Sequence, residues 1–179
     1  DGKDWLVKFR HTYDPADIGE QEYRYMQLAA QCGIEIPECR LIQGKYFASQ
    51  RFDRTERGER IHVATAAALL TESINPPKTD YKTLLSLTGW LTQSPQQVEQ
   101  MFRRMVYNVL IENKDDHAKN FTFLWREGKW RLAPAYDLLP CIDGYHGQHA
   151  TSVMGKGNPT ENDMIAAGES IRINAHRGK

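Results

Sequence analysis

The chain has 179 residues, 40% of them hydrophobic and 26% charged, which is the composition of a folded domain rather than of a disordered or fibrous protein. Its 23 Lys and Arg residues balance 23 Asp and Glu residues, so net charge gives no argument for binding to nucleic acid or membranes. Three cysteines without CxxC spacing argue against a zinc ribbon and a disulfide framework. With no signal peptide and no apolar run long enough to span a bilayer, the chain is predicted to be cytoplasmic.

The first fifty residues predict several strands and one helix. Residues 5–9 alternate along a predicted strand, which places Leu6 and Lys8 on one face of it. Residues 39–53 predict two more strands around a Gln-Gly-Lys turn. Between them, residues 17–33 have the periodicity of a helix that ends at a glycine. The side chains at helical spacing in this segment are Tyr25, Leu28 and Ala29.

Residues 61–111 predict mainly helices. Breaks are expected at residues 75–77, Asn-Pro-Pro, and at residues 94–95, Ser-Pro. Farther along, a short helix is expected near residues 162–167 in a glycine-rich and polar tail. The last helix before residue 111 carries an apolar stripe that should face the core: Phe102, Met105, Val106, Val109 and Leu110.

A predicted hairpin brings polar residues together. Residues 121–125 and 129–133 predict its two strands. Asn120 stands just before the outgoing strand, and Asp137 follows the returning one. Because a hairpin runs out and back at about 3.3 Å per residue, its two ends lie close together, and Asn120 and Asp137 are expected to converge. Asp115 lies five residues before Asn120 in the preceding loop.

These three side chains match the needs of phosphoryl transfer. A triphosphate with Mg²⁺ needs one or two carboxylate or amide oxygens on the metal, and Asn120 and Asp137 fit this role. A separate carboxylate must accept or orient the proton of the attacking hydroxyl, and Asp115 fits that role. The alternative is a loop in which Asp115 and Asp116 only cap or face solvent. In either case, three residues of this run are expected to be solvated or capping residues: Glu112, Lys114 and Asp116.

The same segments resemble a family of kinases. Residues 115–121, Asp-Asp-His-Ala-Lys-Asn-Phe, and residues 132–140, which contain Pro-Ala-Tyr-Asp, resemble the catalytic loop and metal motif of HipA-type toxins. These toxins are bacterial serine/threonine protein kinases. Residues 50–54 are similar to the family segment at the adenine pocket, residues 5–9 to its strand with the ATP-binding lysine, and residues 20–23 to the following helix. The resemblance covers nearly the whole chain in the family's order.

The resemblance implies roles for matched residues. Lys8 would hold the nucleotide phosphates, with Glu22 as its acidic partner and Glu20 as the competing choice. Asp115 would be the catalytic residue, and Asn120 and Asp137 would hold Mg²⁺. Three residues would line the adenine, mainly through backbone groups: Gln50, Arg51 and Phe52. Three more are expected at the nucleotide site, near the phosphates or the metal ligands: His117, Lys119 and Tyr136.

The implied fold is α+β, a protein-kinase-like two-lobe fold. Residues 1–54 are expected to form a partial, strand-rich N-lobe, and residues 55–179 a larger, mostly helical C-lobe that carries the catalytic and metal-binding loops. The family's glycine-rich segment, which carries a regulatory serine, would precede Lys8 and is absent from this sequence. The chain is therefore expected to be a fragment of a longer protein.

The leading interpretation is an ATP- and Mg²⁺-dependent serine/threonine protein kinase, the toxin of a bacterial type II toxin–antitoxin system. The resemblance implies a translation-related protein substrate, such as an aminoacyl-tRNA synthetase. It also implies a HipB-type helix-turn-helix antitoxin, through which contact with DNA would be indirect. One alternative is a small-molecule kinase of the same superfamily. Another is a non-catalytic kinase-like module acting with a DNA-binding antitoxin, although all four central site residues are present: Lys8, Asp115, Asn120 and Asp137.

A metal hydrolase that uses His117 with the aspartates is a further alternative. A single histidine in this run, without a second one at ligand spacing, is a poor match to a transition-metal site. His146 and His149 form an H-x-x-H pair, but they lie in a glycine-rich stretch without an obvious carboxylate partner. This stretch is expected to be a solvated loop.

Overall fold

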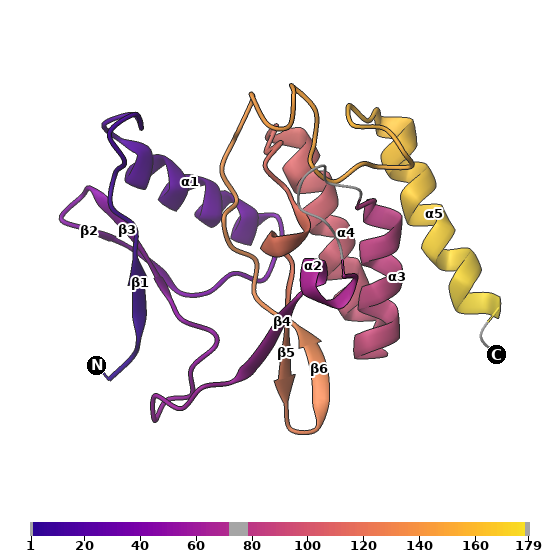
Figure 1. Ribbon diagram of the computed structural model, residues 1–179, viewed down its shortest axis with the longest axis horizontal. Helices are drawn as coiled ribbons and strands as arrows, with labels where there is room; N and C mark the ends of the chain where they lie inside the picture. Colours follow the sequence, from indigo (N-terminus) through magenta and orange to yellow (C-terminus); the bar gives the residue numbers. More distant parts are fainter. Residues whose placement is uncertain (1, 72–78, 178–179) are drawn as a thin grey trace.

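The computed structural model describes residues 2–71 and 79–177 and has two small antiparallel sheets with helices packed around them (Figure 1). The predicted α+β class is confirmed. The predicted break at residues 75–77 lies outside the described residues. In chain order the elements are β1 (Trp5–Val7), α1 (Ile18–Gln31), β2 (Cys39–Ile42), β3 (Tyr46–Gln50), β4 (His62–Thr65), α2 (Ala66–Leu69), α3 (Tyr81–Thr92), α4 (Pro95–Leu110), the 3₁₀ turn η1 (Ala118–Asn120), β5 (Thr122–Arg126), β6 (Lys129–Leu132) and α5 (Glu161–Arg177).

The first sheet has the strand order β1-β3-β2, and α1 packs against it. Antiparallel pairing aligns Trp5 of β1 with Gln50 of β3. The turn that joins β2 to β3 contains Gln43 (φ 53°) and Gly44 (φ 65°), both in the left-handed region typical of tight hairpin turns. The strands and the helix predicted for the first fifty residues are therefore confirmed.

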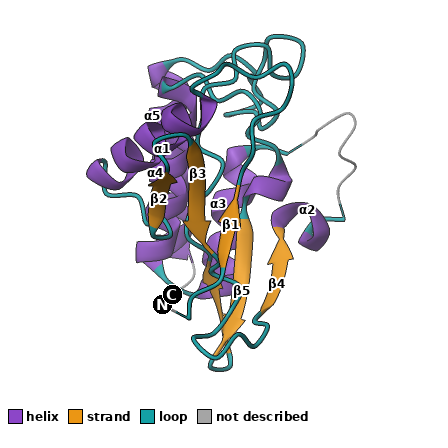
Figure 2. Ribbon diagram, turned by 90° about the vertical axis from the view of Figure 1, so that its left-hand side faces the viewer, coloured by secondary structure: helices purple, strands orange, loops and turns teal. Residues whose placement is uncertain are grey.

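The second sheet has the order β4-β5-β6 and includes a strand that the sequence does not predict (Figure 2). Residues 62–65 are expected to be helical, yet they form β4 and pair with β5. The expectation is wrong because β4 is short and runs directly into an alanine-rich helix, so its sequence resembles that of a helix. Pairing with the distant strand β5 outweighs this local helix propensity. The predicted β5–β6 hairpin is confirmed, and its turn residues Glu127 (φ 54°) and Gly128 (φ 73°) are left-handed.

Helix α4 begins where predicted, with Ser94 at its N-cap and Pro95 as its first residue. Its buried face agrees in part with the predicted apolar stripe, since Met105 is buried and Phe102, Val106 and Val109 pack against the core. Leu110 is 70% exposed, whereas Arg104 and Asn108 are buried. The stripe omits Arg104 and Asn108 because both are polar side chains, and they find hydrogen-bond partners inside the protein.

Helix α1 deviates from its predicted stripe in the same way, since Leu28 is exposed and Glu22 is buried. Charged residues are rarely buried without a partner, so Glu22 indicates a specific contact. Helix α5 is present where a short helix is predicted, and it is longer than residues 162–167. No helix in the described part of the chain combines the length and the apolar character that a membrane span requires.

A small hydrophobic cluster joins the two halves of the chain. Met26 and Ala29 of α1 and Phe47 of β3 pack with Tyr107 of α4 and with Leu138. The Tyr107 hydroxyl also donates a hydrogen bond to a backbone carbonyl of α1 at 2.6 Å. Burial of each large apolar side chain contributes about 1.5–3 kcal/mol. This cluster therefore fixes the first sheet and α1 against α4 and the segment after β6.

A glycine near the start of α1 sets how closely this helix approaches the β2–β3 turn. A Cβ on Gly19 would lie 2.2 Å from the Lys45 carbonyl oxygen. We expect Gly19→Ala to lower the free energy of unfolding by about 1–3 kcal/mol because the backbone must move. Urea unfolding measures this change.

Gly89 in α3 provides the matched control for this prediction. Its Cβ would meet only the Val98 side chain, at 3.4 Å, which is an ordinary contact. Gly89→Ala should therefore raise the free energy of unfolding by up to about 1 kcal/mol through helix propensity. Equal effects of the two substitutions would contradict the close approach at Gly19.

Candidate active site

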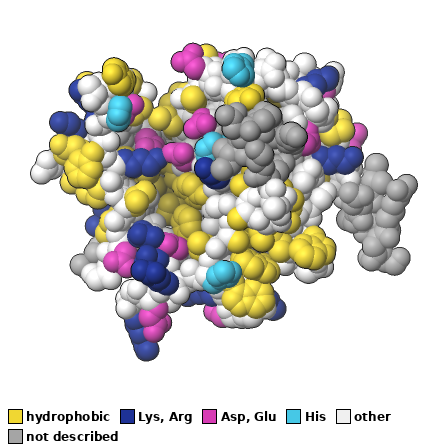
Figure 3. All heavy atoms as spheres, viewed as in Figure 1, with side chains coloured by type: hydrophobic (Ala, Val, Ile, Leu, Met, Phe, Trp, Pro, Cys, Tyr) yellow, Lys and Arg dark blue, Asp and Glu magenta, His cyan; other side chains and the backbone are white. Residues whose placement is uncertain are grey.

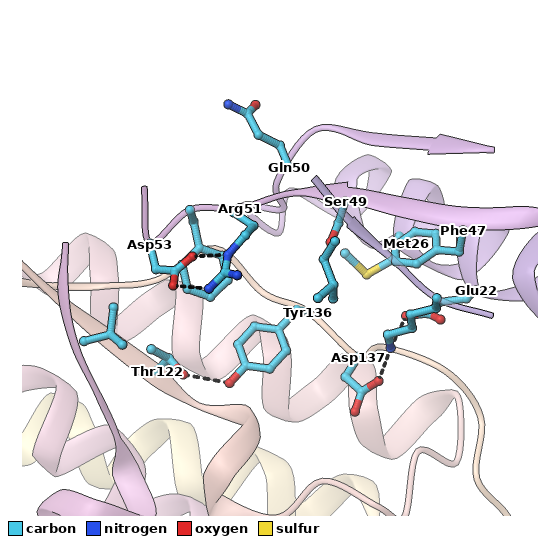
Figure 4. Close-up of a pocket in the computed structure, with 14 residues that line it drawn as sticks. Glu22, Met26, Phe47, Ser49, Gln50, Arg51, Asp53, Thr122, Tyr136 and Asp137 are labelled. Atoms are coloured by element: carbon cyan, nitrogen blue, oxygen red, sulfur yellow. Dashed lines mark hydrogen bonds and ion pairs between the residues drawn. The ribbon is translucent and has the colours of Figure 1, made fainter. Parts of the chain in front are cut away.

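A cavity of about 280 Å³ lies between the two halves of the chain. This volume is near the lower end for small-molecule sites, about 300 Å³. Leu6 and Lys8 both line it, as the alternation of residues 5–9 predicts. Figure 3 shows the hollow with a hydrophobic floor and charged groups around it, and Figure 4 shows its side chains. The other lining residues are Glu22, Met26, Phe47, Ser49, Gln50, Arg51, Phe52, Asp53, Val63, Thr122, Tyr136 and Asp137.

Lys8 follows β1 and contacts two carboxylates from distant segments. Its Nζ atom lies 2.6 Å from Glu22 Oε1 and 2.6 Å from Asp137 Oδ1. Burial alone would lower the pKa of Lys8, but the two carboxylates outweigh it and raise this pKa, so the amine stays charged. Burial raises the pKa of Glu22, while Lys8 acts in the opposite direction. The competing residue Glu20 instead pairs with Arg24 on the outer side of α1.

Asn120 and Asp137 converge at the base of the β5–β6 hairpin, as the hairpin geometry predicts. Asn120 Nδ2 lies 3.4 Å from Asp137 Oδ2, and it also donates to the Asp115 carbonyl at 3.1 Å. The hairpin closes at this end with a 2.8 Å hydrogen bond from the Ala133 amide to the Thr122 carbonyl. Asp137 has a φ of 59°, a left-handed conformation that costs non-glycine residues energy and that is found both in turns and at functional sites.

Asp115 lies on the loop before η1, and its side chain is 59% exposed. His117 Nε2 lies 3.9 Å from Asp115 Oδ1. Partial burial raises the pKa of Asp115, and His117 opposes this shift. The neighbouring carboxylates Asp137 and Asp116 raise the pKa further. An accessible carboxylate beside the Asn120–Asp137 pair is placed to receive a proton from a bound group.

Two aromatic rings form one wall of the cavity. The ring centroids of Phe52 and Tyr136 lie 5.6 Å apart. The Tyr136 hydroxyl donates to the Lys119 carbonyl at 2.7 Å and lies 2.7 Å from Thr122 Oγ1. The wall is therefore fixed both to the loop that carries Asn120 and to strand β5.

The segment after β3, which includes Phe52, also lines the cavity. Arg51 makes two hydrogen bonds with the Asp53 carboxylate, at 2.8 and 2.6 Å, which hold the segment in a bend. The Gln50 side chain points away from the other labelled side chains in Figure 4. A ligand in the cavity would therefore meet mainly the backbone of this residue.

Four of the predicted site residues lie outside the cavity wall: Asp115, His117, Lys119 and Asn120. The Lys119 side chain is exposed, and this residue contributes its carbonyl to Tyr136. His117 Nδ1 is buried and has no hydrogen-bond partner within the described residues. Contacts of these two residues with phosphate stay predictions.

Asp116 and His149 differ from the sequence-based expectation. Asp116 is fully buried instead of solvated, and it accepts a hydrogen bond from the Tyr81 hydroxyl at 2.8 Å. His149 is also buried, with Nδ1 3.0 Å from Asp116 Oδ2, so only His146 lies in an exposed position. A buried carboxylate needs hydrogen-bond donors, and a segment 33 residues away supplies one of them. The carboxylate partner of His149 is Asp116, which lies outside the glycine-rich stretch, so the sequence around the H-x-x-H pair does not reveal it.

Comparisons with known proteins agree with this geometry. A model of the HipA-like C-terminal domain family matches residues 1–177. A Sinorhizobium fredii protein named "Putative kinase Y4dM" is 27% identical over 172 residues, which cover 85% of this chain and 41% of that protein. The chain thus spans less than half the length of this relative.

Two solved structures share the fold. One is HipA of Shewanella oneidensis MR-1, solved in a complex with HipB and operator DNA, with a TM-score of 0.75 and 21% identity over 94% of this chain and 46% of that chain. The other is the proinflammatory kinase CtkA of Helicobacter pylori, with a TM-score of 0.57 and 20% identity over 79% of this chain and 52% of that chain. At these identities the likeness shows the fold, which is kinase-like as predicted.

Replacing Lys8 by methionine should leave Glu22 as an uncompensated buried carboxylate. We expect Lys8→Met to lower the free energy of unfolding at neutral pH by about 1–3 kcal/mol. The loss should be smaller than for a fully buried ion pair because the Lys8 side chain is 39% exposed. Adding Glu22→Gln should recover part of it by removing the buried charge, as measured by urea unfolding.

Glu20→Gln is the control for this pair, because it removes an ion pair on the outer side of the same helix. Such pairs contribute about 0.3–0.5 kcal/mol, so little change is expected. A double variant no more stable than Lys8→Met alone would show that the buried charge of Glu22 is not what destabilises the protein.

Proposed function

Because the chain belongs to the HipA-like C-terminal domain family, we propose that it is the catalytic part of an ATP-dependent serine/threonine protein kinase. The observation that carries the proposal is the meeting of Lys8, Asn120 and Asp137 beside one cavity. Asp115 lies on the adjoining loop and is held by Asn120. A relative named as a kinase supports the reaction class.

The adenine of ATP would occupy the cavity next to Phe52 and Tyr136. Aromatic and aliphatic side chains make up much of the lining, which suits a purine ring. Lys8 supplies a positive charge for the phosphates, and its contact with Glu22 restricts the motion of the amine. A lysine on a strand paired with a glutamate on the next helix is the arrangement that protein kinases use for this purpose.

The residues beside Lys8 fit Mg²⁺. Asp137 offers a carboxylate and Asn120 an amide oxygen, which are the hard oxygen ligands that this ion prefers. Phosphate and water would fill the other positions, and the bound ion would neutralise phosphate charge. Within the described residues, no group of three or more His, Cys, Asp or Glu side chains is arranged to hold a metal ion. A donor set of two residues therefore fits an ion shared with the nucleotide better than the metal centre of a hydrolase.

Asp115 would take the proton of the attacking hydroxyl. As the substrate oxygen bonds to the γ-phosphorus, the bond to the β–γ bridging oxygen breaks and ADP leaves. The hydroxyl proton passes to the Asp115 carboxylate. Asn120 fixes the backbone of Asp115 through its carbonyl, so the proton acceptor and the metal-binding residues would keep a constant separation.

The division into lobes belongs to the same proposal. Residues 1–54 would act as part of the small lobe, because they contain the first sheet and α1. Residues 55–179 would act as the larger lobe with the catalytic and metal-binding loops. The cavity lies at the boundary between these segments, where kinases bind their nucleotide.

We further propose that the whole protein is the toxin of a type II toxin–antitoxin system and acts in the cytoplasm. Its substrate would be a translation-related protein such as an aminoacyl-tRNA synthetase, and the family resemblance supports this part. HipA of Shewanella oneidensis MR-1 was solved with HipB and operator DNA. By analogy, a HipB-type antitoxin would bind this protein and connect it to DNA.

Substitutions at two site residues should separate binding from chemistry. Asp115→Asn should lower phosphate transfer by roughly 100-fold or more and leave ATP binding intact, because only the proton acceptor is lost. Asp137→Asn should also weaken the binding of Mg²⁺ and ATP together, because a metal ligand loses its charge. Transfer from radiolabelled ATP and calorimetric titration of the full-length protein measure the two effects.

Asp143→Asn is the matched control, since it removes a carboxylate at an exposed position in the loop after β6. Both activity and binding should stay unchanged in this variant. Transfer that persists in Asp115→Asn would refute the role of that residue. Failure of the unaltered protein to bind ATP would refute the nucleotide site.

A panel of substrates should distinguish a protein kinase from a small-molecule kinase. We expect the full-length protein to form phosphoserine or phosphothreonine on a purified aminoacyl-tRNA synthetase and to leave aminoglycosides and sugars unmodified. Mass spectrometry detects both products, with Asp115→Asn as the inactive control. Transfer to small molecules alone would favour the small-molecule kinase, and ATP binding without any transfer would favour the non-catalytic module.

A further inference from the structure

A continuous series of buried hydrogen bonds links the loop of Asp115 to the backbone of Asp137. The Tyr81 hydroxyl donates to Asp116 Oδ2 at 2.8 Å and accepts from Asn108 Nδ2 at 3.0 Å. Asn113 Nδ2 then donates to Asn108 Oδ1 at 3.0 Å and to the Asp137 carbonyl at 3.1 Å. We call these residues the Asp116–Asp137 network: Asp116, Tyr81, Asn108, Asn113 and the Asp137 carbonyl.

The first end of the network is a carboxylate with no contact to solvent. Asp116 has an exposed fraction of 0%, and its donors are Tyr81, the Thr151 amide at 3.1 Å and the His149 ring at 3.0 Å. The Thr151 hydroxyl also donates to the Asp116 carbonyl. Burial, together with the Asp116 carboxylate, raises the pKa of Tyr81 well above its ordinary value, so the phenol keeps its proton and donates. The backbone and the side chain of Asp116 are thus both fixed.

The middle of the network lies at the contact between α3 and α4. Tyr81 begins α3, and Asn108 is near the end of α4. The exposed fractions of Tyr81, Asn108 and Asn113 are 0%, 2% and 3%. Apolar side chains would fill this space without the cost of desolvating polar groups. A fully connected polar network instead specifies one arrangement of the groups at its ends.

We propose that the Asp116–Asp137 network sets the distance between the proton acceptor Asp115 and the metal-binding Asp137, so that Tyr81, Asn108 and Asn113 are positioning residues for phosphoryl transfer. This inference rests on the proposed kinase function. One end of the network is the residue directly after Asp115, and the other is the backbone of Asp137 itself. Tyr81, Asn108 and Asn113 do not line the cavity, and the network meets it only at Asp137, whose side chain contacts Lys8. It therefore acts mainly on the geometry of the reaction and less on nucleotide binding.

Tyr81→Phe is the direct test, because it removes one oxygen and interrupts the network at its first link. We expect kcat for phosphate transfer by the full-length protein to fall on the order of tenfold to a hundredfold, as for a displaced catalytic group. The KM for ATP should change less than kcat, because the three network side chains do not line the cavity. Thr88→Val is the matched control, since it also removes a buried hydroxyl from α3, one that contacts only the Leu84 carbonyl.

A second substitution separates positioning from loss of stability. Asn108→Leu interrupts the same network at its second link and should reproduce the fall in kcat. The double variant Tyr81→Phe/Asn108→Leu should show no further fall in kcat, because the effects of two substitutions that interrupt the same network do not add. Thermal unfolding of the unaltered protein and of the four variants records their stability. Losses of kcat that multiply in the double variant, or that follow stability in Thr88→Val as well, would overturn the proposal.

Amide hydrogen exchange provides a readout that does not depend on activity. In Tyr81→Phe the amides of residues 115–120 should exchange faster than in the unaltered protein, and in Thr88→Val they should not. Unchanged exchange in this loop would overturn the positioning role even if kcat fell. If the unaltered protein transfers no phosphate to any substrate, the proposed kinase function fails, while the exchange result still decides whether the network fixes the loop.

Discussion

The contact of Lys8 with two carboxylates is the interaction on which the site depends. Glu22 belongs to α1, and Asp137 follows β6, so a single amine joins three segments that are distant in the sequence. Glu22 is buried, and its charge is tolerated inside the protein because Lys8 lies beside it. The first sheet, the helix and the segment that contains Asp137 therefore hold one relative position, and the cavity is the space that they enclose.

Much of this arrangement follows from short-range patterns in the sequence. Alternation along residues 5–9 places Leu6 and Lys8 on one face, which the structure turns toward the cavity, and the β5–β6 hairpin brings Asn120 to Asp137. Both inferences use one period or one turn, so they need no knowledge of tertiary packing. The order of the motifs then indicates the kinase-like fold, because each matched segment follows the last as in the family. The roles of Asp115, Asn120 and Asp137 stay predictions.

The remaining features depend on contacts between distant segments, and local patterns do not encode these. The buried faces of α1 and α4 include Glu22 and Asn108, which a search for apolar stripes omits. The sequence does not indicate which of the adjacent residues Asp115 and Asp116 is buried. Asp116 is the buried one because Tyr81 and His149 provide hydrogen-bond donors. Strand β4 likewise exists through its pairing with β5. The polar residues of the interior are thus the least predictable, and they are the ones that hold the site together.

The β5–β6 hairpin brings Asn120 and Asp137 close together in space although they are far apart in the sequence. The hydrogen bond between the Ala133 amide and the Thr122 carbonyl closes the hairpin at the end near the site. From this hydrogen bond the two strands extend away from the site to the turn. Adding one residue to each strand would move only the tip, whereas adding a single residue to one strand would reverse which face of that strand points inward. The 17-residue interval between Asn120 and Asp137 therefore reflects hairpin length and not chemistry. Related chains are free to lengthen or shorten this interval in steps of two residues. A sequence motif used to search for such sites should therefore allow an interval of variable length.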